Sequence, residues 1–156
     1  MECVILIGVP ASGKSTFFRQ RFAGTHDHVS KDLLRNNRRP QKRQEQLIAD
    51  ALSAGRSVVV DNTNPSVEVR APLIALAKAH GAQVTGYVFV SEPRDALRRN
   101  RARTGKERVP DVAIFTSFKR LETPRMCYAI VALAMGRFWI GRAWFEAYWL
   151  AFAAME

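Results

Sequence analysis

The stretch VILIGVPASGKSTF, residues 4–17, joins an apolar run to a glycine-containing loop and then to the start of a helix. Residues 8–15 fit the pattern G-x-x-x-x-G-K-[ST], which forms a phosphate-binding loop when a buried strand precedes it and a helix follows. Residues 2–8 are almost continuously apolar, as is typical of a strand covered on both faces. The stretch therefore predicts a nucleoside triphosphate site near the start of the chain.

The residue types in this loop suit the binding of phosphate. Gly8 and Gly13 permit the backbone to turn successive N–H groups into a concave nest, and the helix that follows adds its dipole. Lys14 is expected to reach the β- and γ-phosphates and the hydroxyl of Ser15 to bind Mg²⁺. The residues expected to bind ATP here are Gly8, Pro10, Ala11, Ser12, Gly13, Lys14, Ser15 and Thr16.

The first 124 residues alternate between strand-like and helix-like segments, which indicates an α/β fold with a mainly parallel central sheet flanked by helices. The expected strands are 2–8, 28–30, 57–63 and 83–90, and the expected helices are 14–22, 43–55, 65–81, 93–103 and 109–124. Pro72 is expected either to kink the third helix or to mark its late start. Chain length favours a P-loop NTPase of the small-kinase type, and the absence of an NKxD-like motif disfavours a GTPase.

The chain of 156 residues carries 24 basic and 14 acidic residues, a formal net charge of +10. Such an excess favours anionic partners, namely nucleic acid, nucleotides or a membrane surface, although a basic surface that is merely soluble would look the same. Cys3 and Cys127 form no CxxC motif and no secreted-type framework. No basic region followed by a cleavable apolar stretch begins the chain, so we expect a cytoplasmic protein.

The sequence VSKDLLR, residues 29–35, offers a candidate acceptor site. Asp32 follows the second expected strand, and Arg35 lies three residues on, on the same side of a helix. A carboxylate there can accept the proton of an attacking hydroxyl while the arginine holds an acceptor phosphate. The alternative is an aspartate that caps a helix next to a surface arginine.

A second polar group follows the strand at residues 58–61. Asp61 ends this apolar run, where a carboxylate can bind Mg²⁺ or its waters near the phosphate loop. Asn62, Thr63 and Asn64 then place amide and hydroxyl groups at the carboxyl edge of the sheet, where α/β proteins bind ligands. For these three residues a turn before a helix is the alternative.

Seven basic residues lie between Arg94 and Arg108, and Thr104 with Gly105 interrupts the helix pattern. In a small kinase, such a segment forms a lid that closes over ATP and supplies arginines to the transferred phosphoryl group. Arg99 and Arg103 are the best candidates, because residues four apart share one face of a helix. We refer to residues 94–108 as the lid segment.

The segments GVPASGKST, VSKDLLR, VVVDNTNPS and RNRARTGKERVP…FKRLETP occur in this order over about residues 2–124. Together they resemble the kinase domain of polynucleotide 5′-hydroxyl kinases, within the zeta-toxin and polynucleotide kinase-like P-loop kinases. The resemblance implies transfer of the ATP γ-phosphate to the 5′-hydroxyl of DNA or RNA. It implies Lys14 and Ser15 as phosphate and Mg²⁺ ligands, Asp32 as general base, Arg35 on the acceptor's 3′-side phosphate, and Arg103, with Arg99 second, as lid arginine.

The chain departs from that family at two points. No D-x-D-G-T motif of the phosphatase module often fused to this kinase occurs, so we expect phosphorylation without 3′-end healing. Residues 125–156 hold all three tryptophans and eight of the fifteen aromatic residues, where the family has a polar turn and a last strand. This tail suits a last strand near residues 126–134 and a helix that docks to a protein partner, but equally a frameshifted or fused segment.

The kinase domain is thus expected at residues 1–124, and residues 125–156 form an atypical tail. Charged residues interrupt the apolar sequence of this tail, so it has no stretch of about 20 apolar residues that could span a membrane. Two other functions remain open. One is a P-loop kinase that acts on a small molecule or a tRNA-linked group. The other is a nucleotide-binding module without catalysis, whose aromatic tail docks to a partner or membrane.

Overall fold

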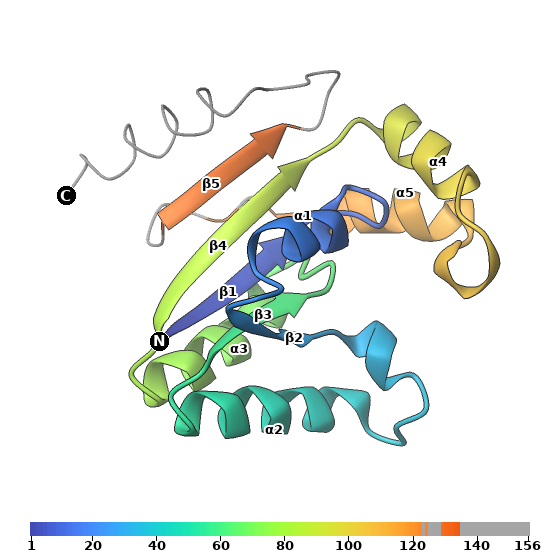
Figure 1. Cartoon of the computed structure of the whole chain (residues 1–156). Helices are drawn as coiled ribbons and strands as arrows, with labels where there is room; N and C mark the ends of the chain where they lie inside the picture. Colours follow the sequence, from blue (N-terminus) through green and yellow to red (C-terminus); the bar gives the residue numbers. More distant parts are fainter. Residues whose placement is uncertain (123, 125–128, 135–156) are drawn as a thin grey trace.

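The computed structural model describes residues 1–122, 124 and 129–134, and in this part of the chain the strands form one five-stranded sheet in the order β2-β3-β1-β4-β5 (Figure 1). Each neighbouring pair is parallel. The elements are β1 (Glu2–Ile7), α1 (Lys14–Arg21), β2 (His26–Val29), the 3₁₀ helix η1 (Lys31–Leu34), α2 (Pro40–Ser53), β3 (Ser57–Asp61), α3 (Val67–Ala79), β4 (Gln83–Val90), α4 (Pro93–Arg101), the 3₁₀ helix η2 (Gly105–Glu107), α5 (Asp111–Arg120) and β5 (Ala129–Ala134).

The sheet is covered on both faces, which explains why its central strands are apolar throughout. On one face α2 and α3 pack through Ile48, Leu52 and Leu73 against alternate residues of β1 and β3. On the other face α1 packs through Phe17 and Phe18 against the intervening residues of the same strands and of β4. The parallel register brings the carboxyl ends of the strands to one edge of the sheet, and the loops that carry the candidate site leave from that edge (Figure 1).

The expected α/β fold with a parallel sheet is confirmed. The late start of the third helix at Pro72 is wrong, because α3 already begins at Val67 and takes Pro72 into its interior. The fourth helix ends at Arg101, so Arg103 does not share its face with Arg99 as expected. The fifth helix begins at Asp111, directly after Pro110.

The tail is described only where Ala129–Ala134 form β5, which pairs with β4. The expected helix that docks to a partner lies outside the described residues. No helix within the described residues has the length and apolar character needed to cross a bilayer.

Asn64 joins the carboxyl ends of β1 and β3. Its side-chain amide donates to the carbonyl oxygens of Leu6 at 2.7 Å and Val60 at 3.3 Å, and the residue is 2% exposed. Its φ of 43° lies in the left-handed region, which asparagine tolerates better than most residues. The adjacent carbonyl of Thr63 accepts a hydrogen bond from the N–H of Gly8 at 3.0 Å. Asn64 therefore fixes the loop after β3 against the loop after β1.

Arg70 anchors the same loop to the end of α5. Its guanidinium donates to the carbonyl oxygens of Asn64 at 2.9 Å, Pro65 at 2.8 Å and Glu122 at 3.1 Å. The carboxylate of Glu122 in turn accepts from the N–H of Val67 at 2.8 Å. These hydrogen bonds hold the residues around Glu122 against the loop after β3, although the two segments are distant in sequence.

The substitution Asn64→Ala is expected to lower the free energy of unfolding by about 2–3 kcal/mol, because it leaves two buried carbonyl oxygens without this donor and places alanine in a left-handed conformation. Urea denaturation monitored by circular dichroism measures the change. The matched control is Asn36→Ala, at an exposed asparagine between η1 and α2, which should change stability by less than about 0.5 kcal/mol. Equal effects of the two substitutions would contradict the bridging role.

Candidate active site

The loop between β1 and α1 is shaped by two glycines. A Cβ on Gly8 would lie 2.9 Å from Cβ of Phe89 and 3.1 Å from its carbonyl oxygen, so no larger residue fits without moving β4. Gly13, immediately before α1, has a φ of 102°, which strongly favours glycine. Ala11 between them also has a positive φ, at 60°. The loop thus has the tight conformation that the G-x-x-x-x-G-K-[ST] pattern predicts.

Lys14 is folded into this loop, with only 7% of the residue exposed. Its ammonium group donates to the carbonyl oxygens of Gly8 at 2.9 Å and Val9 at 2.7 Å, and lies 3.4 Å from Oγ of Ser12. Burial lowers the pKa of Lys14 to about 8; the negative charges of Asp61 and Asp32 oppose this change, and the positive charge of Arg103 adds to it. Asp61, Arg103 and Asp32 therefore all lie within electrostatic reach of the Lys14 ammonium.

Asp61 ends β3 beside the phosphate loop and is 6% exposed. Burial by itself would raise its pKa, but hydrogen bonds from His28 and Ser15 and the charge of Lys14 outweigh burial, so the pKa lies below its ordinary value. Nε2 of His28 is 3.1 Å from Oδ2 of Asp61. The carboxylate is therefore held ionised next to the Ser15 hydroxyl.

The Ser15 and Asp61 oxygens suit Mg²⁺ as donors. Mg²⁺ prefers hard oxygen ligands and is usually held by one or two carboxylates together with substrate phosphates and water. The described residues hold no cluster of three or more His, Cys, Asp or Glu that could bind a metal by itself. The oxygen pair at the phosphate loop is consistent with a cation that arrives with a nucleotide.

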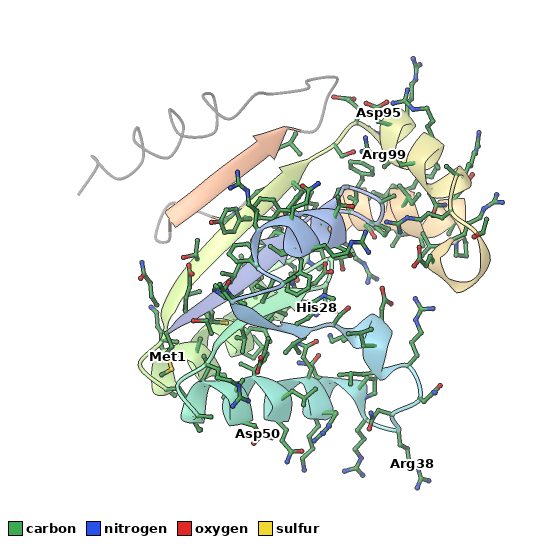
Figure 2. The ribbon with its side chains drawn as sticks, in the orientation of Figure 1. Met1, His28, Arg38, Asp50, Asp95 and Arg99 are labelled. Carbon is green, nitrogen blue, oxygen red and sulfur yellow. The ribbon has the colours of Figure 1, made fainter. Side chains whose placement is uncertain are left out.

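His28 is a site residue that the sequence reasoning missed. It lies on β2 (Figure 2). Its ring stacks on Phe18 with centroids 4.0 Å apart, and Nε2 contacts Asp61 on the neighbouring strand β3. The available signal was the alternation of His26 and His28, which places both rings on one face of a strand. Only the pairing of β2 with β3 shows that this face meets Asp61.

Asp32 and Arg35 lie together on η1, as their spacing predicts. Nη2 of Arg35 is 2.8 Å from Oδ1 of Asp32, and 79% of the Asp32 side chain is exposed. Asp32 is not the helix cap that was considered as an alternative; Ser30 holds that position and accepts from the Asp32 N–H at 3.3 Å. The Asp32 carboxylate therefore faces solvent at the carboxyl edge of the sheet.

Asn62 holds η1 in place from β3. Its Oδ1 accepts from the N–H of Lys31 at 2.9 Å, and its Nδ2 donates to Oε1 of the buried Gln44 at 2.9 Å. Both ends of the Asn62 amide are therefore used within the protein, as is the Asn64 amide. These asparagines position the loops and do not present their amides to a ligand as the sequence suggested.

The lid segment is attached to the phosphate loop at its base. Nε of Arg99 donates to the carbonyl oxygen of Ala11 at 2.7 Å, and its guanidinium also bonds the hydroxyl of Ser91. The Asn100 amide makes two hydrogen bonds to the backbone of Val109, at 2.7 and 3.0 Å, which closes the lid into a loop. Arg103, just beyond α4, donates to the carbonyl of Glu107 at 3.4 Å.

The structure therefore brings Lys14, Ser15, Asp61, Asp32 and Arg103 to one edge of the sheet, with Arg35 bound to Asp32. Arg99 instead supports the phosphate loop through the Ala11 carbonyl. In the rest of the loop, Ser12 is buried and Pro10 is partly buried. The exposed Thr16 accepts a hydrogen bond from Arg19 at 3.5 Å.

The fold and this site define a P-loop phosphotransferase. The model of the AAA domain family matches residues 3–124, and the chain belongs to this family. It is 31% identical over 128 residues to the bifunctional polynucleotide phosphatase/kinase of Schizosaccharomyces pombe, covering 79% of this chain and 30% of that protein. The chain thus spans less than a third of this relative's length, and the resemblance to polynucleotide kinases inferred from the sequence is confirmed.

Two solved structures share the fold. A chain of the Pnkp1/Rnl/Hen1 RNA repair complex is 28% identical, with a TM-score of 0.68 and coverage of 77% of this chain and 43% of that chain. A gluconokinase from Sinorhizobium meliloti is 21% identical, with a TM-score of 0.66 and coverage of 97% and 90%. The gluconokinase supports the small-kinase fold alone. The chain thus has the fold of the P-loop kinases together with a phosphate loop that suits a nucleotide.

Proposed function

We propose that this kinase transfers the γ-phosphate of ATP to the 5′-hydroxyl of a nucleic acid. The observation that carries the proposal is the exposed Asp32–Arg35 pair, whose carboxylate lies within electrostatic reach of Lys14. A carboxylate at this place can accept the proton of an attacking hydroxyl, and the arginine next to it can bind a phosphate of the same acceptor. The similarity to the polynucleotide phosphatase/kinase supports the same acceptor.

In this proposal, one set of residues binds the phosphate donor and another set binds the acceptor. Lys14 and the N–H groups of the loop would bind the phosphates of ATP, while Asp32 aligns the hydroxyl and accepts its proton. Arg35 would hold the acceptor's 3′-side phosphate. Arg103, whose charge acts on Lys14, would stabilise the negative charge on the transferred group once the lid segment closes.

Ser15 and Asp61 would hold Mg²⁺ in this proposal, with His28 keeping the Asp61 carboxylate in orientation. When bound, the cation supplies positive charge to the phosphate oxygens. The stacking of His28 on Phe18 limits the rotation of the imidazole ring, and this helps to keep Nε2 of His28 facing the Asp61 carboxylate.

The test is an acceptor comparison with γ-labelled ATP. We expect an oligonucleotide with a 5′-hydroxyl to gain label, and the same oligonucleotide with a 5′-phosphate to gain none. DNA and RNA versions are assayed in parallel, with gluconate as a sugar acceptor. Transfer to gluconate but to neither oligonucleotide would overturn the proposal in favour of a small-molecule kinase, and nucleotide binding without transfer to any acceptor would favour a non-catalytic module.

A further inference from the structure

A cluster of cations follows the Asp32–Arg35 pair along the chain, from the end of η1 into the first turn of α2. We call Arg35, Arg38, Arg39, Lys42 and Arg43 the basic patch; all five are exposed. No acidic residue occurs between positions 33 and 44. Among the described residues no ion pair joins Arg38, Arg39 or Lys42 to a carboxylate. The patch is therefore a strong local excess of positive charge.

The basic patch does not serve the stability of α2. The amino-terminal end of a helix carries partial positive charge, so each cation there is unfavourable by about 0.3–1 kcal/mol. The first turn of α2 has no acidic residue to offset these cations. The guanidinium of Arg43 donates to a neutral group, Oε1 of Gln46, at 3.3 Å. An external anion would relieve the repulsion within the patch.

The position of the basic patch indicates which kind of anion it binds. The patch begins three residues after Asp32, and Figure 2 shows Arg38 at the outer edge of the molecule, on the segment between η1 and α2. A strand whose 5′ end lies at Asp32 would therefore meet the patch with its next phosphates. A membrane surface fits the charge but not this continuity with Asp32.

We propose that the basic patch binds the backbone phosphates of the acceptor strand on the 3′ side of the reacting nucleotide, beyond the phosphate expected at Arg35. This inference rests on the proposed function. Because the contacts are to phosphates, binding is independent of base sequence and strongly dependent on salt. Affinity should also rise with acceptor length until the strand covers the patch.

The test measures the binding of a fluorescent oligonucleotide of about twelve nucleotides with a free 5′-hydroxyl, by anisotropy across a salt series. The patch variant is Arg38→Gln/Arg39→Gln. Its matched control, Lys119→Gln/Arg120→Gln, removes two neighbouring exposed charges from the last turn of α5. We expect the patch variant to weaken binding about tenfold and to lower the salt slope by about 1.4, since each single-strand phosphate contact contributes about 0.7. The control should stay within about twofold of wild type.

Equal weakening in both variants, or none in the patch variant, would overturn the proposal. So would loss of binding to anionic lipid vesicles, in the patch variant alone, with unchanged oligonucleotide binding. In kinase assays the KM defect of the patch variant should be larger for the long oligonucleotide than for a nucleoside 3′-phosphate. If wild type labels no nucleic acid, the proposed function fails, while the anisotropy comparison still decides whether the patch binds the strand.

Discussion

Asp32→Asn is expected to lower kcat for 5′-hydroxyl phosphorylation by about 10²- to 10⁴-fold, the range attributed to a positioned general base. The asparagine keeps nearly the same shape and retains an oxygen for Arg35, but it does not take a proton from the attacking hydroxyl. Asp32 is largely exposed and lies on η1, outside the phosphate loop, so the substitution leaves that loop and its buried Lys14 in place. We therefore expect the KM for ATP to change by less than about threefold.

The matched control for this prediction is Asp27→Asn. Asp27 lies toward the amino end of strand β2 and is also paired with an arginine, since Nε of Arg56 is 3.0 Å from its Oδ2. Loss of this ion pair should leave kcat within about twofold, because exposed pairs contribute little to stability and Asp27 is outside the site. A kcat for Asp32→Asn within tenfold of wild type would remove Asp32 from the role of base.

The residues that belong to the phosphate loop could be predicted from the sequence because their chemistry is contained in eight consecutive positions. Lys14 and Ser15 follow directly from the G-x-x-x-x-G-K-[ST] pattern and the strand before it. Asp61 could also be predicted, since an ionisable residue that ends an apolar strand has to be compensated. Asp32 and Arg35 needed only the three-residue spacing that places them on one side of a helical turn.

The residues that orient these groups could not be predicted, because their partners are distant in sequence. His28 meets Asp61 only through the pairing of β2 with β3, and Asn62 meets Gln44 only once α2 packs beside η1. The error at Arg103 has a related cause. A helix pattern continues to that residue, but α4 ends at Arg101 and the Asn100 amide is bonded to the backbone of Val109. Local periodicity carries no information about such long-range hydrogen bonds.

Lys14→Met is expected to lower kcat by at least about 10²-fold and to stabilise the fold. Removal of a single preorganised charge from a transition state lowers rates by about 10²- to 10³-fold, and Lys14 is expected to bind the phosphates in both ground state and transition state. The burial of Lys14 also affects the stability of the fold. The difference between the ordinary lysine pKa of 10.5 and a pKa of about 8 corresponds to an unfavourable burial of the charge by about 3 kcal/mol.

Methionine fills a similar volume without that charge, but it leaves the carbonyl oxygens of Gly8 and Val9 without the ammonium donor. We therefore expect a net rise in the free energy of unfolding of about 1–2 kcal/mol at neutral pH. An exposed lysine offers the control: Lys119→Met, in the last turn of α5, should change stability by less than about 0.5 kcal/mol.

The pH dependence distinguishes a buried charge from improved packing. Below about pH 8 Lys14 is protonated in both folded and unfolded chains, so the folded wild type carries the full unfavourable term. Between about 8 and 10.5 the unfolded chain binds more protons at this residue, so the stability of wild type rises with pH relative to the variant. Urea denaturation at about pH 7 and about pH 10 should show the advantage of Lys14→Met shrinking at the higher pH. An advantage of the same size at both pH values would mean that better packing, rather than loss of the buried ammonium, stabilises the variant. A variant less stable than wild type at about pH 7 would contradict the proposal that the fold keeps a destabilising charge at Lys14 in order to bind phosphate.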